Sequence, residues 1–237
     1  MGNKRANVAA VLAMLDEAVR ERCNVVVFPE CCLAGWLSPA AHDCAEPIPG
    51  PFTRRLSASA RRHHISIVIG LEERTRHEGL FNSAILIHPS GSIRLHHRKI
   101  NELEIALTIY SKGTSLAVAE LEGRKVALNI CADSWRPEVT DALWLMGARV
   151  IFSPSAWAVE SGGESTNLNW IKETYRQRAA GRDLHIIAPN AVGAVTEGPW
   201  EGRVLQGNSL VIGPGGDPLL VGPTNEAALV CYELPRG

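Results

Sequence analysis

The chain has 237 residues, of which 46% are hydrophobic, and its 24 Lys and Arg residues nearly balance 25 Asp and Glu residues. A net charge of −1 gives no basic surface for nucleic acid or an anionic membrane, and the sequence contains no signal-peptide pattern and no apolar run of about 18 residues. Six scattered cysteines are too few for a disulfide framework at this length. We therefore expect one domain over residues 1–237, in a reducing cytoplasm, with no nucleic-acid or membrane partner.

Hydrophobic periodicity predicts helices and strands in alternation along the chain. Apolar residues recur at helical spacing in residues 5–20, and an apolar run over 24–29 predicts the first strand. Further helices are predicted at 51–62, 136–146 and 166–181, with a short helix or ordered loop at 100–111. Further strands are predicted at 64–70, 81–88, 92–98, 115–121, 124–131, 148–154, 184–190, 206–212 and 227–233. This order indicates an α/β or α+β fold, and no linker divides the chain.

Three predicted strands end in side chains that can do chemistry. Glu30, Lys99 and Cys131 each stand at the carboxyl end of a strand. In open α/β sheets, ligands bind in the crevice beyond these ends, so we expect the three side chains to meet there. They are distant in the sequence, so only the fold could bring them together.

A carboxylate, an ammonium and a thiol suit acyl transfer. Glu30 could take the proton of the thiol and later deliver it to a departing nitrogen, and Lys99 could stabilise the oxyanion of a tetrahedral intermediate. Pro137 begins a predicted helix just after Cys131, and we expect the helix dipole and free backbone N–H groups to favour the thiolate. The alternative for Cys131 is a packed core cysteine.

The three segments Phe28-Pro29-Glu30, Arg98-Lys99 and Ile130-Cys131-Ala132-Asp133 resemble the nitrilase superfamily of carbon–nitrogen hydrolases. Other matching segments, spread over most of the chain, are Phe81-Asn82-Ser83, Gly113, Gly147-Ala148, Ile151–Trp157, Arg178-Ala179, Asn190 with Gly193, and Gly207-Asn208-Ser209. The resemblance implies a single carbon–nitrogen hydrolase domain over residues 1–237, folded as a four-layer α-β-β-α sandwich of two mixed sheets. Family members usually begin with a strand before the first helix, and this chain starts almost inside that helix. Without that strand, apolar edges and backbone groups would be exposed.

The resemblance also implies roles for residues near these three. Many relatives carry another glutamate between the lysine and the glycine at Gly113, which leaves Glu102 and Glu104 as candidates. We favour Glu104, with a solvated helix carboxylate as the alternative. Asp133, Trp135 and Trp157 are predicted to bind substrate, although aromatic side chains at such positions are as often part of the core.

The predicted activity is hydrolysis of a non-peptide C–N bond in a small amide or N-carbamoyl compound, through a thioester on Cys131. Cys-Ala-Asp at 131–133 resembles the amidase and carbamoylase branches, whereas nitrilases typically have Cys-Trp-Glu. The alternatives are a nitrilase, an N-acyltransferase of the same fold, and a catalytically silent scaffold. No cofactor is required, and no metal site is expected because Cys31 and Cys32 are adjacent and no CxxC pair accompanies them. By resemblance, we expect a small-molecule substrate and a homodimer or higher homo-oligomer.

Overall fold

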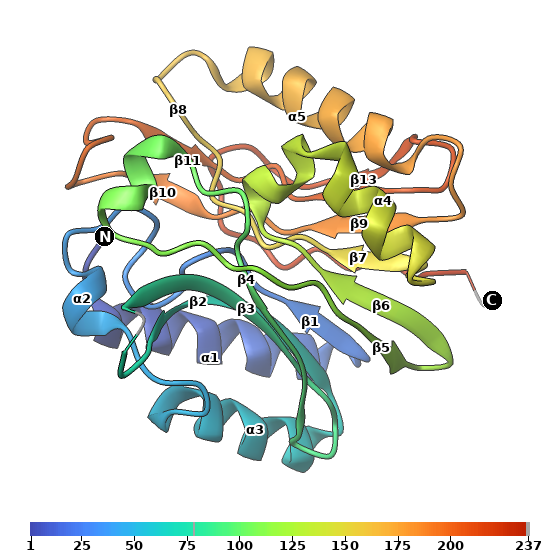
Figure 1. The fold of residues 1–237 in the computed structure, drawn as a ribbon, viewed down its shortest axis with the longest axis horizontal. Helices are drawn as coiled ribbons and strands as arrows, with labels where there is room; N and C mark the ends of the chain where they lie inside the picture. The colour runs from blue at the N-terminus through green and yellow to red at the C-terminus, as the bar shows by residue number, and fades with distance from the viewer. Residues whose placement is uncertain (78, 236–237) are drawn as a thin grey trace.

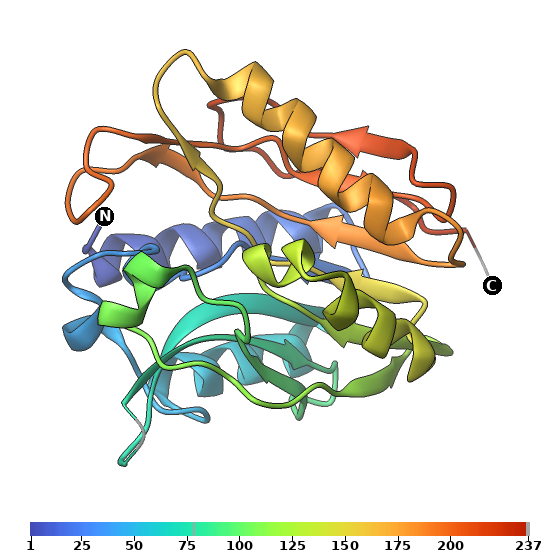
Figure 2. The same ribbon diagram turned by 45° about the horizontal axis from the view of Figure 1, so that its top comes forward.

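The computed structural model describes residues 1–77 and 79–235. Two large β-sheets pack face to face between pairs of helices (Figures 1 and 2). Helices α1 (Lys4–Arg20) and α3 (Pro51–His63) lie outside one sheet, and α4 (Pro137–Leu145) and α5 (Glu164–Ala179) lie outside the other. The predicted four-layer α-β-β-α sandwich of two mixed sheets is therefore confirmed.

The first sheet contains four strands in the order β1-β2-β3-β4. β1 (Val25–Val27) runs parallel to β2 (Ser66–Arg74), and β3 (Leu80–Ile87) and β4 (Ile93–Arg98) continue the sheet as antiparallel neighbours. Nearly every residue of β2 and β3 is buried, because helices cover one face of this sheet and the second sheet covers the other.

The second sheet contains six strands in the order β13-β12-β9-β7-β6-β5. Their bounds in chain order are β5 (Val118–Leu121), β6 (Arg124–Leu128), β7 (Val150–Phe152), β9 (His185–Ala188), β12 (Leu210–Ile212) and β13 (Pro218–Val221). The three central strands β6, β7 and β9 are parallel, and the outer strands are antiparallel to their neighbours. The carboxyl ends of the central strands therefore meet at one edge of the sheet, where Cys131 follows β6.

The alternation of side chains along β2 separates two hydrophobic clusters. Ile67, Ile69 and Leu71 face the helical layer that contains Leu15 of α1, whereas Val68 belongs to the cluster of the second sheet. Successive residues of a strand point to opposite faces, so one strand supplies both clusters. This packing holds β1 and β4, the strands that lead to Glu30 and Lys99, against the sheet that leads to Cys131.

The 3-10 helix η1 (Glu104–Thr108) lies within the stretch 100–111 that is predicted as a short helix or ordered loop. Several other short elements were not predicted: the three strands of a separate small sheet, β8 (Ala158–Val159), β10 (Val192–Ala194) and β11 (Val204–Gln206), together with α2 (Ala41–Cys44) and the 3-10 helix η2 (Cys131–Trp135). Elements of two to five residues are too short to show a hydrophobic period.

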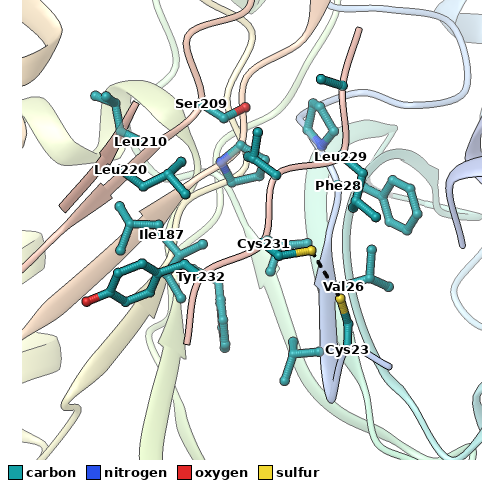
Figure 3. A pocket seen from close by; sticks show the side chains of 18 of the residues that line it. Cys23, Val26, Phe28, Ile187, Ser209, Leu210, Leu220, Leu229, Cys231 and Tyr232 are labelled. Carbon is teal, nitrogen blue, oxygen red and sulfur yellow. Dashed lines mark hydrogen bonds between the residues drawn. The ribbon is translucent and has the colours of Figure 1, made fainter. Parts of the chain in front are cut away.

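The strand predicted over 227–233 is not formed. No backbone hydrogen bond of residues 226–234 is found within the described part of the chain. Figure 3 shows this segment crossing a pocket beside β1, with Leu229, Cys231 and Tyr232 among the side chains that line it. The apolar pattern that predicted the strand is present, but the segment has no neighbouring strand to pair with, and a strand is stabilised by its partners.

β1 is correspondingly an open edge of the first sheet. Phe28 N–H donates to the carbonyl of Val68, and Asn24 accepts from Ser66, so these residues direct their backbone groups toward β2. Alternate residues of a parallel strand face opposite sides, which turns the backbone groups of Val25 and Val27 away from β2. A cavity of about 1120 Å³ lies between this edge, the second sheet and residues 226–234. Val26 of β1 is buried, whereas Val25 and Val27 are partly exposed.

Candidate active site

Glu30 reaches the site from the end of β1. Pro29 ends the strand, and the backbone at Glu30 then passes close to Gly70 of β2, where an added Cβ would lie 2.6 Å from the Cα of Glu30. Only a residue without a side chain allows this approach. Cys31 follows with a left-handed φ of +53°, so the chain turns sharply after Glu30, whose side chain is only 2% exposed.

A buried ion pair joins Glu30 to Lys99. The Nζ atom of Lys99 donates to Oε1 of Glu30 at 2.6 Å, and Nδ2 of Asn82 donates to the same oxygen at 2.6 Å. Burial lowers the pKa of Lys99, but the negative charges of Glu30 and Glu102 outweigh it and hold this pKa well above its ordinary value. Lys99 is therefore an ammonium group, and Oε2 of Glu30 has no hydrogen-bond partner among the described residues.

Cys131 is the first residue of η2, and its thiol lies in the same buried region. Its φ of +46° is unusual for a residue with a side chain, and its backbone N–H donates to the carbonyl of Pro154 at 3.0 Å. Burial, and then the charge of Glu30, raise the pKa of this thiol well above its ordinary value, whereas the charge of Lys99 lowers it. The expectation that a helix dipole favours the thiolate is therefore wrong: η2 separates Cys131 from α4, and burial dominates.

The glutamate beside Lys99 is Glu102, not Glu104. Oε2 of Glu102 lies 3.6 Å from Nζ of Lys99, and Glu102 is 5% exposed. Burial raises the pKa of Glu102 to about 7, although the charge of Lys99 opposes this rise. Glu104 begins η1 as an exposed residue, because the turn that starts there directs it to solvent. The structure thus does not bring the predicted Glu104 to the site.

Asp133, predicted to bind substrate, is buried, and both of its carboxylate oxygens are held by the protein. Its Oδ1 accepts from the backbone N–H groups of Ile100 at 3.0 Å and Asn101 at 2.7 Å. Its Oδ2 accepts from the backbone N–H of Ile130 at 3.0 Å and interacts with Nε2 of His97 at 2.8 Å. Burial raises the pKa of Asp133, but the hydrogen bond and charge of His97 outweigh it and lower this pKa. Asp133 therefore ties the chain on either side of Lys99 to the turn that carries Cys131.

The two predicted tryptophans lie in one aromatic cluster next to the Cys131 turn. Trp135 ends η2 and Trp157 follows β7, and their ring centroids are 5.8 Å apart. Trp170 of α5 stacks edge-on at 5.2 Å from both rings. Trp157 is 6% exposed and packs in the core, whereas Trp135 is 36% exposed. Of the two predicted tryptophans, Trp135 is the one that presents a substantial surface to solvent, and Trp170 beside it is 46% exposed.

Two residues near the ion pair were not assigned roles from the sequence. Asn82 was recognised only as part of a matching segment, yet its side chain holds Glu30. Trp36, in the loop after Glu30, lies with its ring centroid 5.5 Å from Nζ of Lys99 and is 6% exposed. The position of Trp36 in the loop that follows a candidate catalytic residue was the only signal, and loop conformation cannot be derived from periodicity.

The described residues contain neither a membrane-spanning helix nor a cluster of metal ligands. None of their helices is long and apolar enough to cross a bilayer. Within the same residues, no group of three or more His, Cys, Asp or Glu side chains is arranged to hold a metal ion. The thiols of Cys31, Cys32 and Cys44 instead contact the hydroxyl of Tyr110 and the carbonyls of Pro29 and Gly2, respectively.

Residues 2–237 match the family model described as carbon-nitrogen hydrolase, and the chain belongs to this family. Omega-amidase NIT2 of Mus musculus is 26% identical over 235 residues, which cover 95% of this chain and 82% of that protein. An (R)-stereoselective amidase of a Pseudomonas species is 30% identical over 195 residues, covering 81% of this chain and 66% of that protein. This protein is accordingly an enzyme of the carbon–nitrogen hydrolase type.

Solved structures share the fold at low sequence identity. A carbon-nitrogen hydrolase from Helicobacter pylori G27 superposes with a TM-score of 0.85 at 23% identity, covering 94% of this chain and 82% of that chain. An amidase of the nitrilase superfamily from Nesterenkonia AN1 superposes with a TM-score of 0.79 at 21% identity, with the same coverage. Another structure of the Nesterenkonia amidase shows covalent addition of the acetamide moiety of fluoroacetamide at its active site cysteine.

Proposed function

We propose that this enzyme hydrolyses the C–N bond of a small amide or N-carbamoyl compound, with Cys131 as nucleophile, Glu30 as general base and acid, and Lys99 as oxyanion donor. The observation that carries this proposal is the buried Lys99–Glu30 ion pair, 2.6 Å long, in the same buried region as the thiol of Cys131. Family membership supports C–N bond hydrolysis, and the similarity to amidases favours an amide substrate over a nitrile.

The raised pKa of Cys131 explains why a base is needed. A thiol that is protonated at rest cannot attack, so Glu30 takes its proton, and Oε2, which has no other hydrogen-bond partner among the described residues, is placed to receive it. The thiolate then attacks the substrate carbonyl. The ammonium group of Lys99 and the backbone N–H of Ala132 hold the resulting oxyanion.

Collapse of the tetrahedral intermediate breaks the C–N bond. Glu30 returns its proton to the departing nitrogen, so ammonia or an amine leaves and a thioester remains on Cys131. Glu30 next deprotonates a water molecule, which attacks the thioester and releases the acid. These steps need only the side chains of this chain, the substrate and water.

Glu102 completes the charge arrangement of the site. With a pKa raised to about 7, it exchanges a proton near neutral pH, and its position 3.6 Å from Lys99 lets it adjust the charge around the ammonium group. We assign to Glu102 the role predicted for Glu104, namely positioning Lys99 or assisting proton transfer. Trp135 and Trp36 are the aromatic side chains placed to line the substrate path, and Trp157 supports Trp135 from the core.

Covalent labelling of the nucleophile tests the proposal. Fluoroacetamide should transfer its acetamide moiety to the sulfur of Cys131 with loss of fluoride, the modified residue being identified by peptide mass mapping, and small amides should be turned over. A Cys131→Ala variant should lose both adduct and turnover, whereas Cys44→Ser should retain both, because Cys44 contacts the chain near Gly2. Full amidase turnover in Cys131→Ala would refute the assignment. A substrate panel of amides, N-carbamoyl compounds and nitriles, with hydroxylamine as a competing acceptor, separates amidase, nitrilase and acyltransferase activities.

A homodimeric or larger assembly in the cytoplasm is proposed as well. The exposed Trp170 and Trp135, 46% and 36% exposed, form an aromatic patch that favours burial against another copy. Six cysteines without a disulfide among them fit a reducing compartment. Light scattering of the purified enzyme measures the assembly, and Trp170→Ser should weaken it.

A further inference from the structure

Two cysteines from opposite ends of the chain are in direct contact. The Sγ atoms of Cys23 and Cys231 lie 3.7 Å apart, although the residues are 208 positions apart in sequence. Figure 3 shows this pair at the side of the large cavity, with Cys23 below Val26 of β1 and Cys231 on the segment that crosses the cavity. Neither thiol has a part in the proposed reaction.

Solvent access differs among the six cysteines. Cys231 is exposed, Cys23 and Cys32 are partly exposed, and Cys31, Cys44 and Cys131 are buried. Burial, and then the contact with Cys231, raise the pKa of Cys23 to about 11. Cys23 is therefore a thiol at rest, and Cys231 is the sulfur that an oxidant in solution meets first.

The two sides of the contact are held differently. Cys23 is fixed in the turn between α1 and β1, where its N–H donates to the carbonyl of Ala18 at 3.0 Å. Cys231 lies in the segment 226–234, whose backbone makes no hydrogen bond within the described residues. That segment is held mainly by Leu229, which packs on the first hydrophobic cluster, and Leu234, which packs on the second. It can therefore close the remaining gap to bonding distance without breaking a strand.

We propose that Cys23 and Cys231 form a reversible disulfide, a modification site whose oxidant is a small-molecule disulfide such as glutathione disulfide. The Cys231 thiolate attacks one sulfur of glutathione disulfide, forms a mixed disulfide and releases one glutathione thiol. Cys23, after losing its proton to solvent, attacks the Cys231 sulfur and releases the second glutathione thiol. The two protein thiols are oxidised to one disulfide, and glutathione disulfide is reduced to two thiols.

The disulfide would fasten the segment 226–234 to the start of β1. This segment is one wall of the cavity beside the open edge of the first sheet, and β1 leads directly to Glu30. Because Cys23 and Cys231 are 208 positions apart, a link between them closes a long loop and removes much conformational freedom from the unfolded chain. Oxidation should therefore raise the melting temperature by roughly 5–10 °C and slow proteolysis of the carboxyl-terminal segment.

The test uses the full-length enzyme, reduced and then incubated with glutathione disulfide. Peptide mapping without reduction should recover the Cys23 and Cys231 peptides joined, in a protein lighter by two hydrogen atoms. The melting temperature should rise and should return to its starting value with dithiothreitol. Cys23→Ser and Cys231→Ser should each abolish the linked peptides and the rise, whereas Cys44→Ser, which removes a buried thiol elsewhere, should retain both.

Other outcomes would overturn the proposal. These are glutathione retained on Cys231 with Cys23 still open to alkylation, both thiols free after prolonged incubation, or a melting temperature that rises equally in Cys23→Ser. None of these measurements depends on amidase turnover. Their failure would leave the proposed activity untouched, and an inactive enzyme could still form the link.

Discussion

The carboxylate of Asp133 lies 2.7 Å from the backbone nitrogen of Asn101, and this contact joins the two sheets at the candidate active site. Asn101 follows Lys99 by two residues on the exit of β4, and Asp133 follows Cys131 by two residues on η2. Because hydrogen bonds donated to a carboxylate are directional and short, Asp133 sets the distance between the ammonium and the thiol. Its acceptors are fully used by the protein, so we regard Asp133 as a positioning residue.

Replacing Asp133 by asparagine should therefore lower both turnover and stability. An amide has only one acceptor oxygen, so buried N–H groups of Asn101, Ile100 or Ile130 lose their acceptor, at a cost of about 2–4 kcal/mol in the free energy of unfolding. Displacement of Lys99 from Cys131 should reduce kcat by about 100-fold with a smaller change in KM. Asp141→Asn on α4, where the carboxylate is 43% exposed, is the matched control and should cost under about 1 kcal/mol. An unchanged kcat in Asp133→Asn would contradict this role.

Replacing Lys99 by methionine should make Cys131 less reactive as well as removing the oxyanion donor. The charge of Lys99 lowers the pKa of Cys131 against burial and the charge of Glu30, so its loss should raise that pKa further. The rate of alkylation by iodoacetamide, followed against pH, should fall by about 10-fold or more at neutral pH, and turnover by roughly 100- to 1000-fold. Lys112→Met, at an exposed lysine further along the chain, should change neither the alkylation rate of Cys131 nor turnover. Equal alkylation rates in Lys99→Met and the unmodified enzyme would be inconsistent with the charge arrangement described.

The raised pKa of Glu102 predicts a specific pH dependence of stability. Between pH 4.5 and about 7 the folded state keeps a proton on Glu102 that the unfolded state releases, so this group makes the protein less stable as pH rises through that window. In Glu102→Gln, the free energy of unfolding should therefore fall less over this pH range, by an amount on the order of 1–3 kcal/mol. Urea unfolding at several pH values measures this difference. Glu104→Gln, at the exposed neighbour, should leave the pH profile unaltered. Identical profiles for both variants would mean that Glu102 titrates normally.

Gly70 should not tolerate even a methyl group. An alanine Cβ there would lie 2.6 Å from Cα of Glu30 and 2.7 Å from the carbonyl oxygen of Pro29, and backbone cannot move aside as a flexible side chain can. We expect Gly70→Ala to lower the free energy of unfolding by roughly 2–3 kcal/mol and to reduce turnover by displacing Glu30. Gly215→Ala is the control, because its new Cβ would meet only a carboxylate oxygen of Asp217 at 3.3 Å. Thermal unfolding and amidase rates should be measured for Gly70→Ala and Gly215→Ala. If Gly70→Ala were as stable and active as Gly215→Ala, the predicted clash with Glu30 would be refuted.

The sequence predicted the long elements and the three central residues of the site well, for physical reasons. Helix α1 and strands such as β3 bury one or both faces, so their hydrophobic period records their position. Glu30, Lys99 and Cys131 each follow an apolar run. Strands β1 and β4 run in the same direction, so Glu30 and Lys99 leave the first sheet at one edge, and Cys131 follows β6 of the sheet packed against it. Their convergence beyond strand ends could be expected from the sequence, and their catalytic roles stay a prediction.

Two predictions failed: Glu104 as the glutamate beside Lys99, and a strand over 227–233. Both depend on contacts that hydrophobic periodicity does not record. Leu103 and its neighbours give no indication whether Glu102 or Glu104 turns inward, because the loop that carries them takes its shape from η1 and from the charge of Lys99. The segment 227–233 has the pattern of a strand, but a strand needs a partner, and residues 226–234 make no backbone hydrogen bond within the described part of the chain.

By itself, the sequence determined the order of helices and strands, their buried faces and the identity of the residues at the strand ends, because local periodicity and residue chemistry encode these directly. Only the tertiary structure decided that burial raises the pKa of the Cys131 thiol, that Asp133 accepts hydrogen bonds from the chain beside Lys99, and that Cys23 meets Cys231. Desolvation, charge proximity and contacts across the two sheets produce these properties, and each arises between residues that the sequence leaves far apart.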